Sequence, residues 1–137
     1  MDIRPYSPAD RDACLEIFDS NLPLESRHLF ATFLDGVPAD FFVAEHNNEI
    51  VACGGFEING ETARLQWGMV HSKLQRQGLG RFLLFYRMRQ ITRNASVQIV
   101  NLECPRQAAP FFASQGFREV TGNGEAVVMV KRLAVCP

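Results

Sequence analysis

The sequence predicts an α+β fold: a mixed, mostly antiparallel sheet with one parallel strand pair and helices on both faces. Three short strand-like segments joined by tight turns in the middle of the chain are typical of an antiparallel meander. A long helix-like segment then leads to another strand, and a crossover of this length joins parallel strands. The expected order is β-α-α-β-β-β-α-β-α-β-β, within a single domain over residues 1–137.

The first part of the chain is expected to form one strand and two helices. The strand covers residues 3–6. Ser7 followed by Pro8 is typical of a helix start, with Ser7 as the N-cap and Pro8 in the first turn. In the helix that follows, three apolar residues share one face at helical spacing: Cys14, Ile17 and Phe18. A second helix is expected over residues 25–34.

The meander is expected in the next 30 residues or so. Its three strands are predicted over residues 41–44, 50–58 and 62–70. Gly54 and Gly55 in the second strand suggest a β-bulge. Asn59-Gly60 predicts a type I′ turn between the second and third strands, because this turn needs positive φ at both central residues.

The helix after the meander is apolar on several sides, which favours close packing on a sheet. One apolar row recurs at i, i+3, i+4 and i+7 and a second runs beside it: Leu79, Phe82, Leu83 and Tyr86, then Leu84, Met88 and Ile91. Its basic residues, Arg87, Arg89 and Arg93, are expected on a solvated face.

The last part is expected to form a strand, a short helix and two more strands. Their predicted ranges are residues 97–102, 105–115, 117–120 and 126–130. Gly116 suits the position just after the helix, where a left-handed residue usually stands, and Phe117 would pack back on it. The final strand could pair across a homodimer, although no residue requires this.

Composition excludes several classes of protein. Apolar residues make up 47% and charged residues 21%, which indicates a soluble, globular chain and argues against disorder. No apolar run approaches the roughly 18 residues that cross a membrane, and the start lacks a signal peptide, so a cytoplasmic protein is expected. The four cysteines are scattered, which favours reduced thiols.

Charge is distributed unevenly along the chain. The net charge of −1 gives no global attraction for nucleic acid, and no aromatic-basic platform accompanies the arginines. Between Thr62 and Leu102, however, the sequence has basic residues and neither Asp nor Glu. A polyanionic ligand would therefore meet little opposing charge in this stretch.

The most informative stretch joins the meander to the long helix. Gln75-x-x-Gly78-x-Gly80 places two glycines where a helix begins, and a helix start has unpaired amides and partial positive charge. Glycine lets phosphate oxygens approach such amides closely. The stretch lacks the Gly-Lys-Ser/Thr of a P-loop and the third glycine of a dinucleotide fingerprint. It predicts a site for a phosphorylated ligand.

With these motifs in this element order, the chain resembles the GNAT superfamily of acetyl-CoA-dependent N-acetyltransferases. Val70-His71-Ser72 is similar to the family's V-x-P entry, with Ser72 in place of proline. The segment from Gln75 to Gly80 is similar to its (Q/R)-x-x-G-x-(G/A) pyrophosphate loop. Residues 108–117 are similar to its A-x-x-F-Y-x-x-x-G-F helix, and the resemblance covers nearly the whole chain.

The resemblance implies acetyl-CoA as cosubstrate, an amine as acceptor and no metal. It implies that the parallel strands splay apart, that Gly68, Met69 and Val70 hold the pantetheine arm, and that Phe111 and Phe112 lie near the sulfur. The residues implied to bind the pyrophosphate are Gln75, Arg76, Gln77, Gly78, Leu79, Gly80 and Arg81.

The residues for proton transfer depart from the family pattern. Many relatives carry Glu where this chain has Arg64, and Tyr where it has Phe112, and Phe cannot donate a proton. Glu103 and His71 are the remaining candidates for general base. Two functions stay open: an N-acetyltransferase acting on a small molecule or a protein, and a catalytically weak acetyl-CoA-binding regulatory module. The acceptor is expected between the first two helices and the open end of the sheet. This wall offers five polar side chains: Asp19, Asn21, Glu25, Arg27 and His28.

Overall fold

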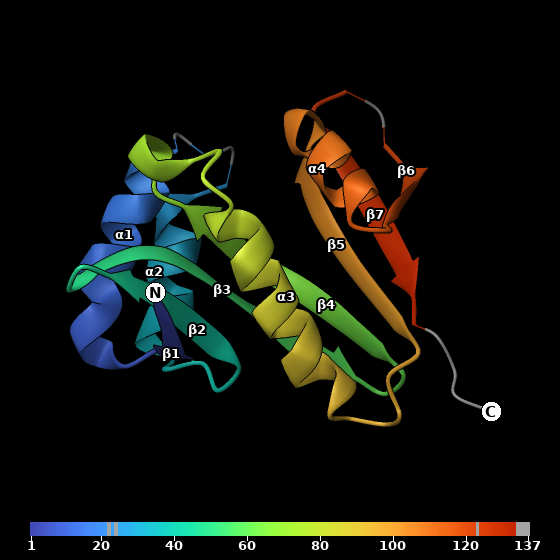
Figure 1. The fold of residues 1–137 in the computed structure, drawn as a ribbon, viewed down its shortest axis with the longest axis horizontal. Helices are drawn as coiled ribbons and strands as arrows, with labels where there is room; N and C mark the ends of the chain where they lie inside the picture. Colours follow the sequence, from blue (N-terminus) through green and yellow to red (C-terminus); the bar gives the residue numbers. More distant parts are fainter. Residues whose placement is uncertain (22, 24, 123, 134–137) are drawn as a thin grey trace. The chain divides into compact units, whose positions relative to one another are not determined.

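The computed structural model describes residues 1–21, 23, 25–122 and 124–133 (Figure 1). In chain order its elements are β1 (Asp2–Pro5), η1 (Pro8–Asp10), α1 (Arg11–Ser20), α2 (Arg27–Asp35), β2 (Phe41–His46), β3 (Glu49–Asn59), β4 (Thr62–Val70), η2 (Ser72–Leu74), α3 (Leu79–Thr92), β5 (Ile99–Pro105), η3 (Arg106–Ala108), α4 (Ala109–Ser114), β6 (Arg118–Thr121) and β7 (Ala126–Arg132). The described strands form a seven-stranded sheet in the order β1-β2-β3-β4-β5-β7-β6. The predicted α+β class and element order are confirmed.

The chain divides into two compact units. Unit 1 comprises Met1–Gly55 and Trp67–Arg89, and unit 2 comprises Phe56–Gln66 and Gln90–Pro137. Strands β3 and β4 contribute residues to both units, so the division runs through the meander. The assignment of the whole chain to a single domain stays a prediction.

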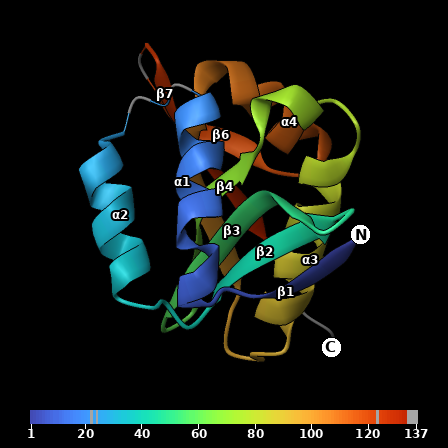
Figure 2. The same cartoon turned by 90° about the vertical axis from the view of Figure 1, so that its left-hand side faces the viewer.

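In unit 1, helices cover both faces of the strands, as predicted (Figure 2). Val43 and Cys53 face α1 and α2, in a core that also holds Phe18 and Phe30. Their neighbours Ala44 and Ala52 face the opposite way, in a cluster with Leu83 of α3. The alternation follows from the strand period of two, which sends successive side chains to opposite faces.

The start of α1 confirms the predicted N-terminal signals. Ser7 is the N-cap and Pro8 opens the first turn, which is the 3-10 helix η1. The Ser7 amide donates to the Asp10 carboxylate at 2.9 Å, and Arg4 donates to both Asp10 oxygens at 2.8 Å. Cys14, Ile17 and Phe18 are all buried, as their helical spacing predicts.

One prediction about the meander is wrong, and another stays a prediction. The β2–β3 register shifts between Ala44 and Glu45 and is regular at the glycine pair, so a β-bulge at Gly54 and Gly55 stays a prediction. The turn before β4 is Gly60-Glu61, one residue later than predicted, and only Gly60 has positive φ, which is the type II′ pattern. Asn47-Asn48, between β2 and β3, instead has the two positive φ values (52° and 64°) of a type I′ turn.

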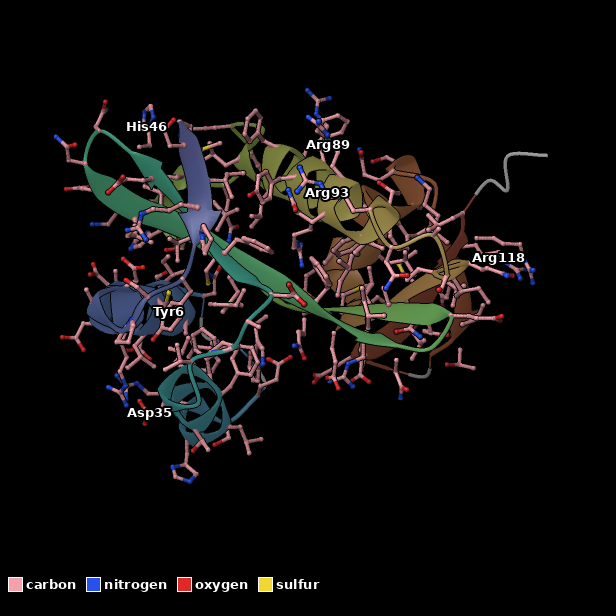
Figure 3. All side chains as sticks on the ribbon, turned by 90° about the horizontal axis from the view of Figure 1, so that it is seen from below. Tyr6, Asp35, His46, Arg89, Arg93 and Arg118 are labelled. Atoms are coloured by element: carbon pink, nitrogen blue, oxygen red, sulfur yellow. The ribbon has the colours of Figure 1, made fainter. Side chains whose placement is uncertain are left out.

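The predicted exposure of α3 is wrong at Arg87. This side chain is only 4% exposed, whereas Phe82 and Phe85 are 50% and 63% exposed. Arg89 in the helix and Arg93 just after its end are exposed, as predicted (Figure 3). The helix therefore turns one arginine toward the sheet and two phenylalanines toward solvent, which its hydrophobic pattern did not indicate.

Unit 2 contains the parallel strand pair. Its β4–β5 ladder joins Thr62 to Ile99, Ala63 to Val100 and Arg64 to Asn101, and β7 pairs antiparallel with β5 along the whole of β5. The helix α4 ends at Ser114, and Gly116, just after its C-cap, has φ of 93°, which confirms the predicted left-handed residue. The Phe117 ring packs back on Phe112 with centroids 5.8 Å apart.

Within the described residues, no helix is long and apolar enough to cross a lipid bilayer. Three of the cysteines, Cys14, Cys53 and Cys104, are buried free thiols, which agrees with the predicted reduced state. The fourth, Cys136, lies outside the described residues.

Candidate functional site

In unit 1, hydrogen bonds to β3 and to α1 hold the start of the connection from β4 to α3. The His71 amide donates to the Val51 carbonyl at 2.9 Å, which extends the pairing beyond the end of β4. The Ser72 amide donates to the Ser20 hydroxyl at 3.1 Å, so the last turn of α1 fixes the next residue. These bonds hold the start of the connection against the core.

Gln75 is held by its side chain. It donates to the Asn21 side-chain oxygen, and Asn21 in turn donates to the Val70 carbonyl at 2.9 Å. Sequence reasoning placed Asn21 on the wall for the acceptor and did not foresee this role. The only signal in the sequence was a polar residue at the end of a helix, which is compatible with many roles.

The segment between Gln75 and α3 has the backbone geometry that the glycine pattern indicated. Gly78 has φ of 84°, and a side chain added there would meet no atom within 4 Å. Arg76 also adopts a left-handed φ of 66°, which is uncommon for a residue with a side chain. Residues 75–78 are exposed. The loop is therefore open to solvent on the side that a ligand would approach.

The beginning of α3 leaves several amides without an intrahelical acceptor. The amide of Phe82 donates to the Gly78 carbonyl at 3.0 Å, and the three preceding amides have no carbonyl four residues earlier in the helix. These amides belong to Leu79, Gly80 and Arg81. They carry the positive end of a 14-residue helix dipole, which favours a negative group in front of them.

The charges around the loop also favour a negatively charged ligand. Arg76 and Arg81 are exposed, and in the described parts of the chain neither forms an ion pair. Because no acidic residue occurs from Thr62 to Leu102, the loop's own segment contributes no opposing charge. A diphosphate would thus meet free amides, a helix dipole and two available cations.

The end of β4, in front of this loop, has an unusual backbone. Trp67 has φ of 55°, which for a large side chain is a genuine outlier, although its ring packs in the core against Phe30 with centroids 4.8 Å apart. Such strained residues cluster at functional sites. The next residue, Gly68, is exposed, and Met69 and Val70 are half-buried.

His71 is placed at the junction of β4 and η2. Its Nδ1 accepts the Lys73 amide at 3.2 Å, and its Nε2 lies 3.9 Å from a Glu16 oxygen. The ring therefore caps the short helix η2 with one nitrogen and has only the other available for proton transfer.

Unit 2 contains the other predicted site residues. Glu103 is exposed on β5, and Phe111 and Phe112 are half-buried on α4 with their rings 5.0 Å apart. Beside them Cys104 is buried, and this burial raises the pKa of its thiol. Although β4 and β5 both continue, their ladder within unit 2 ends at the pair of Arg64 and Asn101.

The surface around Arg64 is a shallow polar hollow of about 420 Å³ in unit 2. Its lining residues come from β3, β4 and β5: Glu57, Asn59, Thr62, Arg64 and Asn101. Sequence reasoning had identified only Arg64 in this group. The wall expected for the acceptor lies on α1 and α2. There the Asp19 carboxylate is already paired with Arg27 at 3.0 Å.

A model of the acetyltransferase (GNAT) domain matches residues 38–119, which is more than half of the chain. The chain belongs to the GNAT family. This GNAT domain is an acetyltransferase, and its enzyme class is acyltransferase. No curated protein sequence matches the chain.

Solved structures agree with the GNAT fold. The ribosomal-protein-S18-alanine N-acetyltransferase from Escherichia coli is 22% identical with a TM-score of 0.82, over 99% of this chain and 96% of that one. The PaiA N-acetyltransferase from Thermoplasma acidophilum, in complex with coenzyme A, is 16% identical with a TM-score of 0.78, over 96% and 98%. Rv2747 from Mycobacterium tuberculosis, in complex with CoA and NLQ, is 19% identical with a TM-score of 0.78, over 98% and 100%.

Proposed function

We propose that this GNAT protein transfers the acetyl group of acetyl-CoA to a primary amine of a small molecule or a protein. The observation that carries the proposal is the loop at the start of α3, where free amides, exposed Arg76 and Arg81, and the open space at Gly78 occur together. These features fit the diphosphate of coenzyme A. Relatives of this fold have been crystallised with coenzyme A, which supports the choice of ligand.

The remaining cofactor contacts are carried over from the family pattern to residues of β4 and α4. The end of β4 offers Gly68, Met69 and Val70, whose backbone would pair with the amides of the pantetheine arm. Phe111 and Phe112 would supply apolar contacts at its sulfur end. The strained Trp67 supports this part of the proposal, because it re-aims the strand just before the pairing residues.

The proposed reaction is direct acyl transfer. The neutral amine attacks the thioester carbon, the C–S bond breaks, and the electron pair leaves with sulfur. At pH 7 an alkyl ammonium with a pKa near 10.4 must give up a proton at a cost of roughly 4–5 kcal/mol. Glu103 is the better candidate for this proton because it is exposed, whereas one nitrogen of His71 already accepts an amide.

A second function is a catalytically weak acetyl-CoA-binding module that regulates a partner. Two residues favour it: Arg64 stands where the family pattern has Glu, and Phe112 where it has Tyr. A module of this kind would keep the pyrophosphate loop intact and lose the groups that move protons.

Calorimetry with coenzyme A and acetyl-CoA tests both functions, and a screen of amines that follows thiol release separates them. An enzyme binds acetyl-CoA and releases thiol with at least one class of amine. A regulatory module binds equally well and releases none. If neither ligand binds, both functions are excluded.

A further inference from the structure

Arg87 is a buried cation without an acidic partner. Its Nη1 donates to the Gly55 carbonyl at 3.2 Å, and its Nε has no hydrogen-bond partner among the described residues. The side chain is 4% exposed, and no Asp or Glu contributes to its electrostatics. A charge in such surroundings is costly unless something else compensates it.

The strands are shaped to admit this guanidinium. A side chain at Gly54 would come within 3.1 Å of the Arg87 Cζ, and one at Gly68 within 2.7 Å of its Nη2. Two glycines, one on β3 and one on β4, thus leave the space that Arg87 fills. This accounts for the glycine at position 54.

Arg87 lies beneath the part of β4 that the proposed function assigns to the pantetheine arm. Gly68 is exposed, and the guanidinium that lies beside it comes from α3. Arg87 is eight residues after Leu79, which is roughly 12 Å along the helix from the proposed pyrophosphate amides. A pantetheine arm spans a distance of this order, so its sulfur end would lie near Gly68.

We propose that Arg87 is an electrostatic positioning residue for acetyl transfer, acting across the Gly68 backbone on the negative charge that develops at the thioester oxygen and the departing sulfur. This inference rests on the proposed function. Arg87 neither gives nor takes a proton: the C–S electron pair leaves with sulfur, and the ammonium proton goes to the base. A fixed positive charge would stabilise the thiolate without a proton donor.

The surroundings of Arg87 are suited to this role. Burial lowers the pKa of its guanidinium to about 10, so it stays charged at neutral pH. The titratable group that faces it is Cys53 of β3, and the hydrogen bond with Cys14, followed by burial, raises the pKa of that thiol well above its ordinary value. Cys53 is therefore neutral and leaves the charge of Arg87 uncompensated.

The test compares Arg87→Met and Arg87→Lys with the wild-type protein, using coenzyme A itself as the probe. The pKa of the bound thiol is read from thiolate absorbance against pH. We expect coenzyme A to bind all three within about threefold. In Arg87→Met the thiol pKa rises enough to lower the bound thiolate fraction about tenfold at neutral pH, and in Arg87→Lys it stays near the wild-type value. Arg93→Met, at an exposed residue just after α3, is the matched control and leaves the thiol pKa unchanged.

Thermal unfolding separates this role from a structural one. Because Arg87→Met removes an unpaired buried charge, its Tm is expected to equal or exceed that of the wild type. If Arg87→Met does not fold, Arg87→Gln takes its place as the neutral variant. Equal thiol pKa values in the wild type and the neutral variant overturn the inference and leave the proposed function intact. Failure of the wild type to bind coenzyme A removes the proposed function itself.

Discussion

The loop at the start of α3 has more of the groups that its proposed role needs than the surface of β5 and α4 has. In unit 1 the loop combines free amides, a glycine with positive φ and exposed cations, which are the features that the proposed diphosphate site needs. In unit 2, Glu103 is exposed, but Phe112 stands where the family pattern has a proton donor. The difference teaches that cofactor binding is more fully specified in this chain than proton transfer.

The largest expected effect comes from the loop. Replacing Gly78 with valine forces a branched residue into a φ of 84° and places it where the diphosphate would approach, so we expect the Kd for coenzyme A to rise at least about 30-fold. Gly60→Val is the matched control, because Gly60 also has positive φ and open space around it. Calorimetry measures both; equal losses in the two variants would show that the loop has no special role.

The second prediction restores a proton donor on α4. Phe112→Tyr puts a hydroxyl near the proposed sulfur end, and we expect the rate of thiol release to rise up to about tenfold at saturating acetyl-CoA. Phe111→Tyr on the same helix is the control and should not change the rate. No increase in Phe112→Tyr would mean that lack of this donor does not limit the reaction.

A smaller effect is expected from one cation of the loop. Arg81→Gln removes a charge beside the helix start, and the Kd for coenzyme A should rise about fivefold at low salt, with a weaker dependence on salt than in the wild type. Arg93→Gln, at an exposed arginine just after this helix, should change neither quantity. A salt dependence that stays the same in Arg81→Gln would argue against a phosphate contact.

The smallest effect on binding is expected from a residue that stabilises unit 1 away from the loop. The hydrogen bonds from Arg4, followed by those from Ser7, lower the pKa of Asp10 below its ordinary 3.8. Asp10→Asn should cost about 1–2 kcal/mol at pH 7, reduced by the 39% exposure of Arg4, and leave coenzyme A binding unchanged.

The pH dependence of that loss has a defined sign. A carboxyl whose pKa is lowered on folding contributes stability above its unfolded pKa and loses it as the pH falls through the folded value. The wild type and Asp10→Asn should therefore differ at pH 7 and converge below about pH 3.8, as measured by urea unfolding. A difference that persists unchanged in acid would assign the loss to packing instead of charge.

Much of the fold could be predicted because local patterns are strong here. The helical spacing of Cys14, Ile17 and Phe18 places all three in the core, and Gly116 ends α4 as expected. Gln75-x-x-Gly78-x-Gly80 also located the candidate loop. Each of these signals depends on neighbours within one or two helical turns, so it is present in the sequence itself.

The errors have a common origin in contacts between distant segments. The contact that calls for glycine at position 54, the Arg87 guanidinium, comes from a helix more than 30 residues later and was not foreseen. Asn21 could not be assigned to the loop, since its partners Val70 and Gln75 are about 50 residues away. Arg87 itself follows the pattern of a solvated arginine until the position of β3 and β4 is known.

The amino-acid sequence alone determined the order of helices and strands, the place of the glycine loop and the excess of positive charge around it, because each depends on residue type and short-range spacing. Only the tertiary structure decided which way Arg87 points, what Gln75 is tied to and how far β4 and β5 stay paired. Those outcomes depend on which backbone groups from remote segments are available as partners, and local preferences do not contain that information.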